Sequence, residues 1–183
     1  MLHSTRRYNQ AFIALGSNLE NPVSHIQQAY LDLSALPDTT VQKRSSLYKS
    51  EPIGLIDQPD FINAVTEIET ALQPLELLEK LLNIEKQHGR IRNSDSYPNA
   101  PRTLDLDVLL YGALQLKHKQ LILPHPRMLQ RAFVLLPLLE IAPDCEIAGH
   151  GKIKEYLAGC SDQIIERLDI IQLKPVKSQF KQP

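Results

Sequence analysis

The order of apolar segments along the chain constrains its fold more than any other feature of the sequence. Apolar or β-branched stretches predict strands, and apolar residues that recur every three or four positions predict helices. In chain order these are a strand at 11–15, a helix at 21–33, strands at 41–48 and 61–70, a helix from 74 ended by Gly89, and a strand at 104–111. This βαββαβ order predicts the α+β class and a ferredoxin-like core, an antiparallel sheet with both helices on one face. A C-terminal helical extension is expected at 134–141.

The size of the chain favours a single domain. With 183 residues, of which 43% are hydrophobic, the chain can bury one sizeable core. We therefore expect one domain over residues 10–172, flexible tails at 1–9 and 173–183, and a monomer. The ends are assigned as tails because they are polar or lack periodicity.

Charge and hydropathy favour a small ligand over a macromolecular partner. A net charge of −1 and a pI near 6.6 give no broad electrostatic reason to bind nucleic acid. No run of about eighteen apolar residues occurs, and the basic start lacks the apolar stretch of a secretory signal, so no membrane is expected as a partner. Cys145 and Cys160 match neither a disulfide framework nor a CxxC metal site, which favours a reducing, cytoplasmic location.

Asp105 and Asp107 form the sharpest chemical signal in the sequence. Residues two apart on a strand point to the same side, so both carboxylates project together while Leu104, Leu106 and Val108 point to the other side. Adjacent carboxylates repel each other unless cations neutralise them, and hard oxygen ligands suit Mg²⁺ shared with substrate phosphates. Taken alone, the pair is also compatible with a solvated strand face.

Arginines lie next to the two aspartates. Arg90, Arg92 and Arg102 precede the strand, and guanidinium groups beside metal-binding carboxylates suit a polyphosphate. Taken singly, each arginine would more often be a surface ion-pair partner. The chain has no G-x-x-x-x-G-K-[ST] motif, which excludes a P-loop as the phosphate site.

Two further stretches add candidate binding residues. His125 lies between Pro124 and Pro126, and Arg131 follows shortly after. Both side chains could reach the far phosphates or the charge that develops in a transition state. Phe61 and Asn63 share one face of a strand, which places a ring for stacking beside an amide that can donate and accept. That pair suits a flat heterocycle, although Phe61 without this context would be simple core. Residues 16–18, Gly-Ser-Asn, favour a tight turn.

A series of short motifs runs through most of the chain. The most specific is P-R-T-L-D-L-D at 101–107. The others are F-I-A-L-G-S-N-L at 12–19, D-Q-P-D-F-I-N-A at 57–64, I-E at 84–85, G-R-I-R at 89–92, P-H-P-R-M at 124–128 and R-A-F at 131–133. In these motifs and their order the chain resembles the hydroxymethyldihydropterin pyrophosphokinase family from about residue 12 to 146. The resemblance implies an enzyme of folate biosynthesis that transfers pyrophosphate from ATP to the hydroxymethyl group of 6-hydroxymethyl-7,8-dihydropterin and releases AMP.

The resemblance also implies a role for individual residues. Asp105 and Asp107 would hold two Mg²⁺ ions that bridge the ATP phosphates, and Arg90 and Arg102 would be catalytic. The ATP-binding residues implied by the family are Arg90, Arg102, Val108, His125 and Arg131. The implied pterin-binding residues are Ser50, Ile53, Phe61, Asn63 and Phe133, with the two rings on either side of the bicycle.

The chain departs from the family pattern at three places. Many members carry a tryptophan just before P-R-T-L-D-L-D, where this chain has Tyr97-Pro98-Asn99-Ala100, and it contains no tryptophan at all. Leu82 and Gln120 stand where some members have a glutamine and an arginine. Contacts to the adenine and phosphates from these points are expected to differ.

Two alternative functions are compatible with parts of the sequence. Another Mg²⁺-dependent nucleotidyl or phosphoryl transferase would share the carboxylates but would not require Phe61, Asn63 and Phe133. An RNA-binding or regulatory module of ferredoxin-like fold would require exposed aromatic residues and a basic face, whereas this chain is 5% aromatic and has no net positive charge. For the pyrophosphokinase reaction that the resemblance implies, the polar loops at 50–60 and 90–101 are expected to close over ATP.

Overall fold

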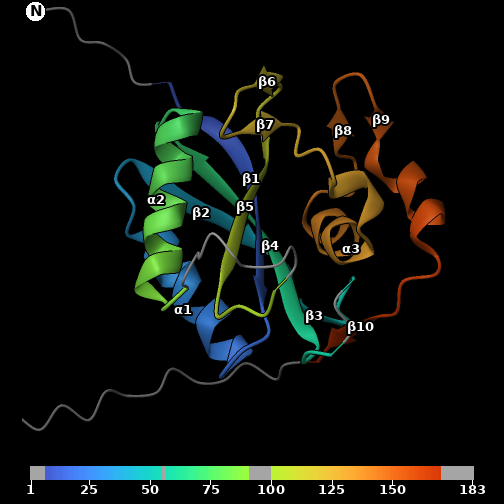
Figure 1. The fold of residues 1–183 in the computed structure, drawn as a ribbon. Helices are drawn as coiled ribbons and strands as arrows, with labels where there is room; N and C mark the ends of the chain where they lie inside the picture. The colour runs from blue at the N-terminus through green and yellow to red at the C-terminus, as the bar shows by residue number, and fades with distance from the viewer. Residues whose placement is uncertain (1–6, 55–56, 91–99, 170–183) are drawn as a thin grey trace, which may run out of the picture.

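Six strands form one antiparallel sheet at the centre of the molecule (Figure 1). The computed structural model describes residues 7–54, 57–90 and 100–169. The strands are β1 (Asn9–Ser17), β2 (Thr39–Arg44), β3 (Leu47–Ser50), β4 (Phe61–Thr70), β5 (Asp105–Tyr111) and β10 (Ile165–Leu168). They lie in the order β10-β3-β4-β1-β5, with β2 also paired to β4, and every pairing is antiparallel. The prediction of a mixed fold with an antiparallel sheet is confirmed.

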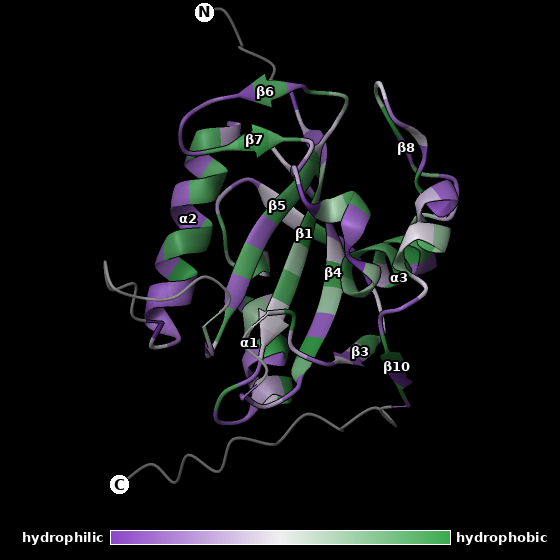
Figure 2. Cartoon of the chain, turned by 45° about the vertical axis from the view of Figure 1, so that its right-hand side comes forward, coloured by the Kyte–Doolittle hydropathy of each residue, from purple (hydrophilic) through white to green (hydrophobic). Residues whose placement is uncertain are grey.

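Helices α1 (Pro22–Ser34) and α2 (Pro74–Gln87) cover one face of the sheet (Figure 1). Both begin at a proline, which suits the first helical position because the missing N–H would have no partner there. Asn21 caps α1, since its Oδ1 accepts from the Ser24 N–H at 3.3 Å. Hydrophobic residues interleave with hydrophilic ones along α2, as expected of a helix with one buried face (Figure 2). The buried residues of the two helices are Ile26, Ala29, Tyr30, Leu33, Leu77, Leu81, Ile84 and Glu85.

Helix α3 (Ala132–Ile141) covers the opposite face of the sheet (Figure 1). It packs into a second core that includes Phe12, Val65 and Leu109 from three neighbouring strands. The helix was predicted at 134–141 and begins two residues earlier. Its first N–H, that of Ala132, donates to Gln163 Oε1 at 2.9 Å, a distant contact that local periodicity does not reveal.

The single strand predicted at 41–48 is wrong, because the structure has two strands there. β2 ends at Arg44 and β3 starts at Leu47, and both pair with β4. Ser45 lies between them. Its N–H donates to the Val65 carbonyl at 2.9 Å, and its Oγ accepts from the Val65 N–H at 3.0 Å. This side-chain contact replaces a regular ladder bond and lets the chain change direction before Ser50.

Several short elements were not predicted. A hairpin joins β6 (Leu116–Lys117) to β7 (Ile122–Leu123), and another joins β8 (Glu146–Ile147) to β9 (Gly151–Lys152). The 3-10 helices are η1 (Met128–Gln130) and η2 (Ile153–Cys160). The C-terminal strand β10 pairs with β3 and becomes an edge of the sheet, where Ile165 lies opposite Ser50. The predicted tail at 173–183 lies outside the described residues, and Asn9 of the other predicted tail already belongs to β1.

Strand β5 presents different residues to the two faces of the sheet. Leu106 and Val108 lie in the core beneath α1 and α2, whereas Asp105 and Asp107 line a cavity on the α3 side. The pairing of β5 with β1 shifts register beyond this point, so that Val108 pairs with Ile13 and Leu110 with Phe12. Such a bulge re-aims side chains on one strand and often occurs next to functional sites.

Two other sequence features have a simple outcome in the structure. Cys145 and Cys160 are both free thiols, and burial raises the pKa of each. In the described ranges, no helix combines the length and the apolar character needed to cross a membrane.

Candidate functional site

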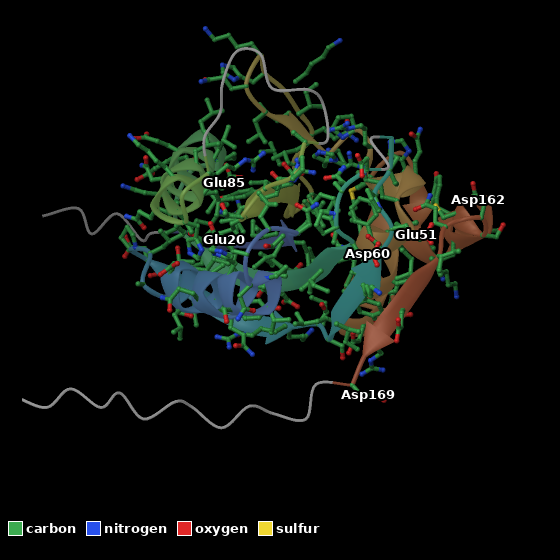
Figure 3. All side chains as sticks on the ribbon, turned by 60° about the horizontal axis from the view of Figure 1, so that its bottom comes forward. Glu20, Glu51, Asp60, Glu85, Asp162 and Asp169 are labelled. Carbon is green, nitrogen blue, oxygen red and sulfur yellow. The ribbon has the colours of Figure 1, made fainter. Side chains whose placement is uncertain are left out.

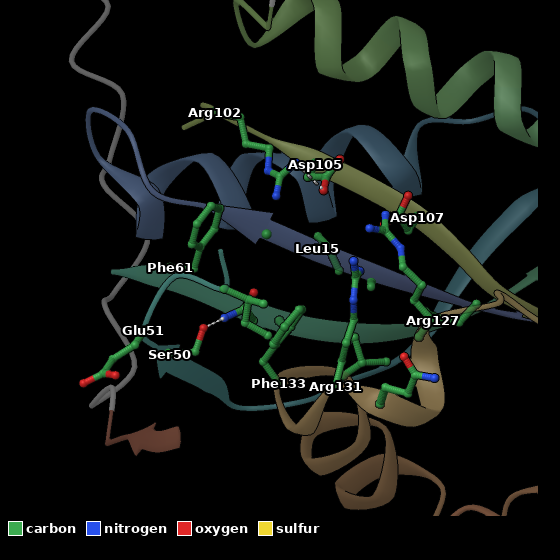
Figure 4. Close-up of a pocket in the computed structure, with 18 residues that line it drawn as sticks. Leu15, Ser50, Glu51, Phe61, Arg102, Asp105, Asp107, Arg127, Arg131 and Phe133 are labelled. Atoms are coloured by element: carbon green, nitrogen blue, oxygen red, sulfur yellow. Dashed lines mark hydrogen bonds and ion pairs between the residues drawn. The ribbon is translucent and has the colours of Figure 1, made fainter. Parts of the chain in front are cut away.

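A cavity of about 210 Å³ opens on the α3 side of the sheet. Strands β1, β4 and β5 form its floor, and the segment around Ser50, the chain at Arg102 and the start of α3 form its walls (Figure 4). The lining residues are Ala14, Leu15, Gly16, Ser50, Glu51, Ile53, Phe61, Asn63, Ala64, Arg102, Asp105, Asp107, Leu109, Arg127, Gln130, Arg131, Phe133 and Val134.

The two carboxylates of β5 have different surroundings. Asp105 accepts a hydrogen bond from Arg90 and forms an ion pair with Arg102, whose NH1 lies 3.3 Å from Oδ2. Asp107 Oδ2 lies 3.9 Å from His125 Nε2, and 38% of the Asp107 side chain is exposed. Asp105 is therefore held between two arginines, whereas Asp107 faces the open cavity.

The electrostatics at Asp107 fit a bound cation. Burial and the neighbouring Asp105 raise the pKa of Asp107 above its ordinary value, and the cationic groups nearby do not cancel this shift. Within the described ranges, no group of three or more His, Cys, Asp or Glu residues is placed to hold a metal ion. Two carboxylates alone suit Mg²⁺, because this ion usually keeps waters and binds substrate phosphates at its other positions. The donor set therefore fits a metal that arrives with a phosphorylated substrate.

Arg127 and Arg131 enter the cavity from the segment before α3 (Figure 4). Burial lowers the pKa of Arg131 below its ordinary value, and the like charge of Arg127 adds to the effect. Among the described residues, neither guanidinium forms an ion pair with a carboxylate. Two adjacent cations of this kind favour a polyanion as ligand, since it would relieve their mutual repulsion.

His125 lies next to Asp107, and its lowered pKa favours the neutral ring. Burial lowers the pKa of its ring below 6.5, and the positive charges of Arg131 and Arg127 act in the same direction. Its Nδ1 accepts from the Arg127 N–H at 3.3 Å, so the ring proton of the neutral form is on Nε2. His125 therefore presents an N–H donor toward Asp107.

Two aromatic rings stand beside the cavity, and each has an arginine over its face (Figure 4). The Arg102 Cζ lies 5.2 Å from the centroid of the Phe61 ring, and the Arg131 Cζ lies 5.4 Å from that of Phe133. Such contacts hold a guanidinium in place without removing its charge. The aromatic side of the cavity is therefore continuous with its cationic side.

The floor between the rings and the carboxylates is shaped by Gly16 and Asn63. Asn63 Nδ2 donates to Ser50 Oγ at 3.0 Å, which orients its Oδ1 toward Gly16. A Cβ on Gly16 would lie 3.5 Å from that oxygen and 3.9 Å from the Asp105 Cβ. The glycine thus keeps this part of the floor flat, and the amide oxygen can accept a hydrogen bond from a ring edge.

The structure brings most of the predicted site residues to this one cavity. Those that line it are Ser50, Ile53, Phe61, Asn63, Arg102, Asp105, Asp107, Arg131 and Phe133. Val108 lies instead in the core on the other face, with 2% of its surface exposed. Arg90 does not line the cavity either, since its NH1 binds Glu85 Oε1 at 2.6 Å and also contacts Asp105. Of the predicted closing loops, residues 55–56 and 91–99 lie outside the described residues.

Sequence reasoning missed several lining residues. Arg127 belongs to the P-H-P-R-M motif and was given no role of its own, although a second arginine four residues before Arg131 was a usable signal. Gln130 also lines the cavity, because the single turn of η1 places it beside Arg131. Glu51 follows the end of β3 and gave no separate signal.

The fold and the site together define an α+β enzyme that can hold a polyanion with its metal next to a flat ring. The family model for 7,8-dihydro-6-hydroxymethylpterin-pyrophosphokinase (HPPK) matches residues 12–143. Proteins called 2-amino-4-hydroxy-6-hydroxymethyldihydropteridine pyrophosphokinase are also similar. That of Haemophilus influenzae is 43% identical over 159 residues, covering 87% of this chain and 98% of the relative. That of Pseudomonas aeruginosa is 44% identical over 159 residues, covering 87% and 96%. The chain belongs to the HPPK family.

Solved structures give a similar picture of the fold. A Plasmodium falciparum HPPK-DHPS A437G structure with SDX-DHP superposes with a TM-score of 0.67 at 14% identity, covering 85% of this chain and 46% of that one. A wild-type structure of the same protein gives a TM-score of 0.60 at 15% identity, with 82% and 43% covered. The chain spans less than half of these solved chains, and the similarity at this identity concerns the fold alone.

Proposed function

We propose that this chain transfers the pyrophosphoryl group of ATP to the hydroxymethyl group of 6-hydroxymethyl-7,8-dihydropterin in folate biosynthesis, with AMP as the second product. The observation that carries the proposal is the single cavity in which Asp105 and Asp107 lie beside Phe61 and Phe133. Its chemistry matches the two substrates that this reaction brings together. Enzymes named for this reaction are 40% to 45% identical to the chain over the matched residues.

The pterin would occupy the aromatic part of the cavity. Phe61 and Phe133 offer ring faces for stacking, and Asn63 offers an amide oxygen to the N–H groups of the ring edge. Ser50 orients that amide, and Ile53 adds apolar surface at the rim. These groups would distinguish a flat heterocycle from a flexible alcohol.

ATP would occupy the charged part. Asp105 and Asp107 would hold Mg²⁺ together with the phosphates, and the metal would neutralise charge on the phosphate oxygens. Arg102, Arg131 and His125 would bind phosphate oxygens from other directions, since each offers N–H donors near the carboxylates. Arg90, which contacts Asp105, would fix the position of that carboxylate and reach the phosphates when they are bound.

The reaction requires alignment more than covalent catalysis by the protein. The hydroxyl oxygen of the pterin would attack the β-phosphorus of ATP, lose its proton and form a new P–O bond. The bond from the β-phosphorus to the oxygen that bridges it to the α-phosphorus would break, and AMP would leave. Holding two substrates in line can contribute about 7–11 kcal/mol to lowering the barrier, and fixed charges such as Arg102 add to this.

The proposal extends to the organisation of the chain. The strand order β5-β1-β4-β2 and the position of α1 and α2 on one face support a ferredoxin-like plan for the core. The described elements, which run from Asn9 to Leu168, support one domain over residues 10–172. We further propose that this domain acts as a monomer.

A direct assay tests the proposed function. The protein is incubated with ATP, Mg²⁺ and 6-hydroxymethyl-7,8-dihydropterin, and the nucleotide products are separated. We expect AMP that forms only when the pterin is present. Formation of ADP, or release of AMP that does not depend on the pterin, would reject the proposal.

A further inference from the structure

Asn18 makes a set of hydrogen bonds that its place at the end of β1 does not require. It follows the last residue of the strand and is buried, with 3% of its surface exposed. Its Oδ1 accepts from the Arg102 N–H at 2.8 Å. Its Nδ2 donates to Gln58 Oε1 and to the Pro59 carbonyl, each at 2.9 Å. Both ends of the amide are thus used.

An amide is the side chain that fits this position. The Arg102 N–H can only donate and the Pro59 carbonyl can only accept, so one end of the side chain must accept and the other must donate. An aspartate would satisfy the Arg102 N–H but would place a carboxylate oxygen against the Pro59 carbonyl. An alanine would leave these buried polar groups without their partners. The contacts therefore explain the residue type as well as its location.

The segments joined by Asn18 carry groups from the two halves of the cavity. Pro59 precedes Phe61 by two residues, and Phe61 stands on the aromatic side. Arg102 contributes the guanidinium that contacts Asp105 and covers the Phe61 ring. The Asn18 backbone N–H also donates to the Arg102 carbonyl, at 3.0 Å. Asn18 itself does not line the cavity.

We propose that Asn18 is a positioning residue that fixes Arg102 relative to Phe61 and thereby aligns the nucleotide with the pterin. This inference rests on the proposed function. Because Asn18 contacts neither substrate, its loss should change alignment more than affinity. A misplacement of about 1 Å can lower the rate of an aligned reaction about 10²-fold. The expected signature is a fall in kcat with little change in KM.

The test compares Asn18→Ala and Asn18→Asp with the wild-type protein. For Asn18→Ala we expect kcat to fall about 10- to 100-fold, with KM for ATP and for the pterin changed by less than about threefold. Asn18→Asp keeps the acceptor for the Arg102 N–H, so its kcat should lie between that of Asn18→Ala and that of the wild type. Gln58→Ala removes one partner from the opposite side without changing β1, and its effect should not add to that of Asn18→Ala because both changes break the same contact.

Asn21→Ala is the matched control. Like Asn18, Asn21 is an asparagine, but it lies at the start of α1, and its side chain accepts only from the Ser24 N–H. This variant should lower Tm and leave kcat unchanged, which separates loss of stability from loss of alignment.

The outcomes separate the two proposals. A wild-type protein that forms no AMP rejects the proposed function. An active wild type with normal kcat in both Asn18 variants rejects the positioning role. Asn18 variants that raise the KM of both substrates and keep a normal kcat also reject the positioning role.

Discussion

Arg102 lies over the ring of Phe61, with 5.2 Å between the guanidinium carbon and the ring centroid, while its NH1 lies 3.3 Å from Asp105. One side chain therefore contacts both the aromatic part and the acidic part of the cavity. A planar guanidinium can stack and bind oxygens at the same time, which the compact ammonium group of lysine cannot do. Arg102 thus joins the two halves of the site.

Replacing Arg102 by lysine should therefore impair catalysis although the charge is kept. We expect Arg102→Lys to lower kcat/KM at least about 10-fold, because bidentate phosphate contact and stacking are both lost. Arg44→Lys is the matched control, since the Arg44 Cζ lies 4.6 Å from the Tyr30 ring centroid and outside the cavity lining. Steady-state kinetics of both variants provide the measurement. Equal rates for Arg102→Lys and the wild type would contradict this role.

Asp107 should matter for turnover and not for folding. Since its pKa is raised by burial and by Asp105, removing it relieves an unfavourable charge in the free protein. We expect Asp107→Ala to keep or slightly raise Tm and to lower kcat about 10²- to 10³-fold, as for the loss of one electrostatic stabiliser. Asp162 is exposed, follows the end of η2 and does not line the cavity (Figure 3), so the surface variant Asp162→Ala should change neither quantity. Near-normal turnover of Asp107→Ala would reject its metal-binding role.

Arg127 should contribute to nucleotide binding. It shares the rim of the cavity with Arg131 and has no carboxylate partner among the described residues. We expect Arg127→Ala to weaken binding of a non-hydrolysable ATP analogue about 10-fold, and Arg127→Lys to recover part of that loss. Calorimetry at two salt concentrations should also show a weaker salt dependence for the alanine variant. Lys154→Ala, an exposed cation on η2, serves as control, and an identical effect there would indicate a general charge effect.

Glu140 should give the fold an acid-sensitive contact between α3 and the edge of the sheet. It accepts from the Ser46 N–H at 2.9 Å and from the Tyr48 hydroxyl at 2.9 Å. Burial alone would raise its pKa, but hydrogen bonds from Ser46 and Tyr48 outweigh this and lower the pKa below 4.5. A lowered folded-state pKa means that stability is present above the unfolded value and is lost as pH falls through the folded value.

The corresponding variant is Glu140→Gln. It should be less stable than the wild type by roughly 1 kcal/mol near neutral pH, a figure kept small because the group is partly exposed. This difference should shrink as the pH falls below about 4.5. Urea unfolding of both proteins between about pH 3 and 7 provides the measurement, with exposed Glu155→Gln as control. A difference that stays constant over this range would contradict the linkage.

Local patterns were sufficient to predict the main strands and helices. The alternation around Asp105 and Asp107 placed both carboxylates on one face, because period-two geometry depends only on neighbouring residues. The starts of α1 and α2 could be predicted from Pro22 and Pro74, because proline suits the first position of a helix. The resemblance to the family then predicted half of the residues that line the cavity.

Features that depend on distant contacts could not be predicted in this way. The break between β2 and β3 comes from the contact of Ser45 with Val65, and β10 exists because it pairs with β3. Asn18 was interpreted as part of a tight turn, whereas its partners lie 40 to 84 residues away in the sequence. A short polar motif shows no such partners until the chain is folded.

The fate of the β-phosphate tests the central claim most directly. ATP labelled at the β-phosphorus is incubated with the protein, Mg²⁺ and 6-hydroxymethyl-7,8-dihydropterin, and the products are separated. If the cavity aligns the pterin hydroxyl with the β-phosphorus, the label appears in the pterin product and unlabelled AMP is released in equal amount. Label that remains in ADP, with a pterin product carrying only the γ-phosphate, would contradict the account.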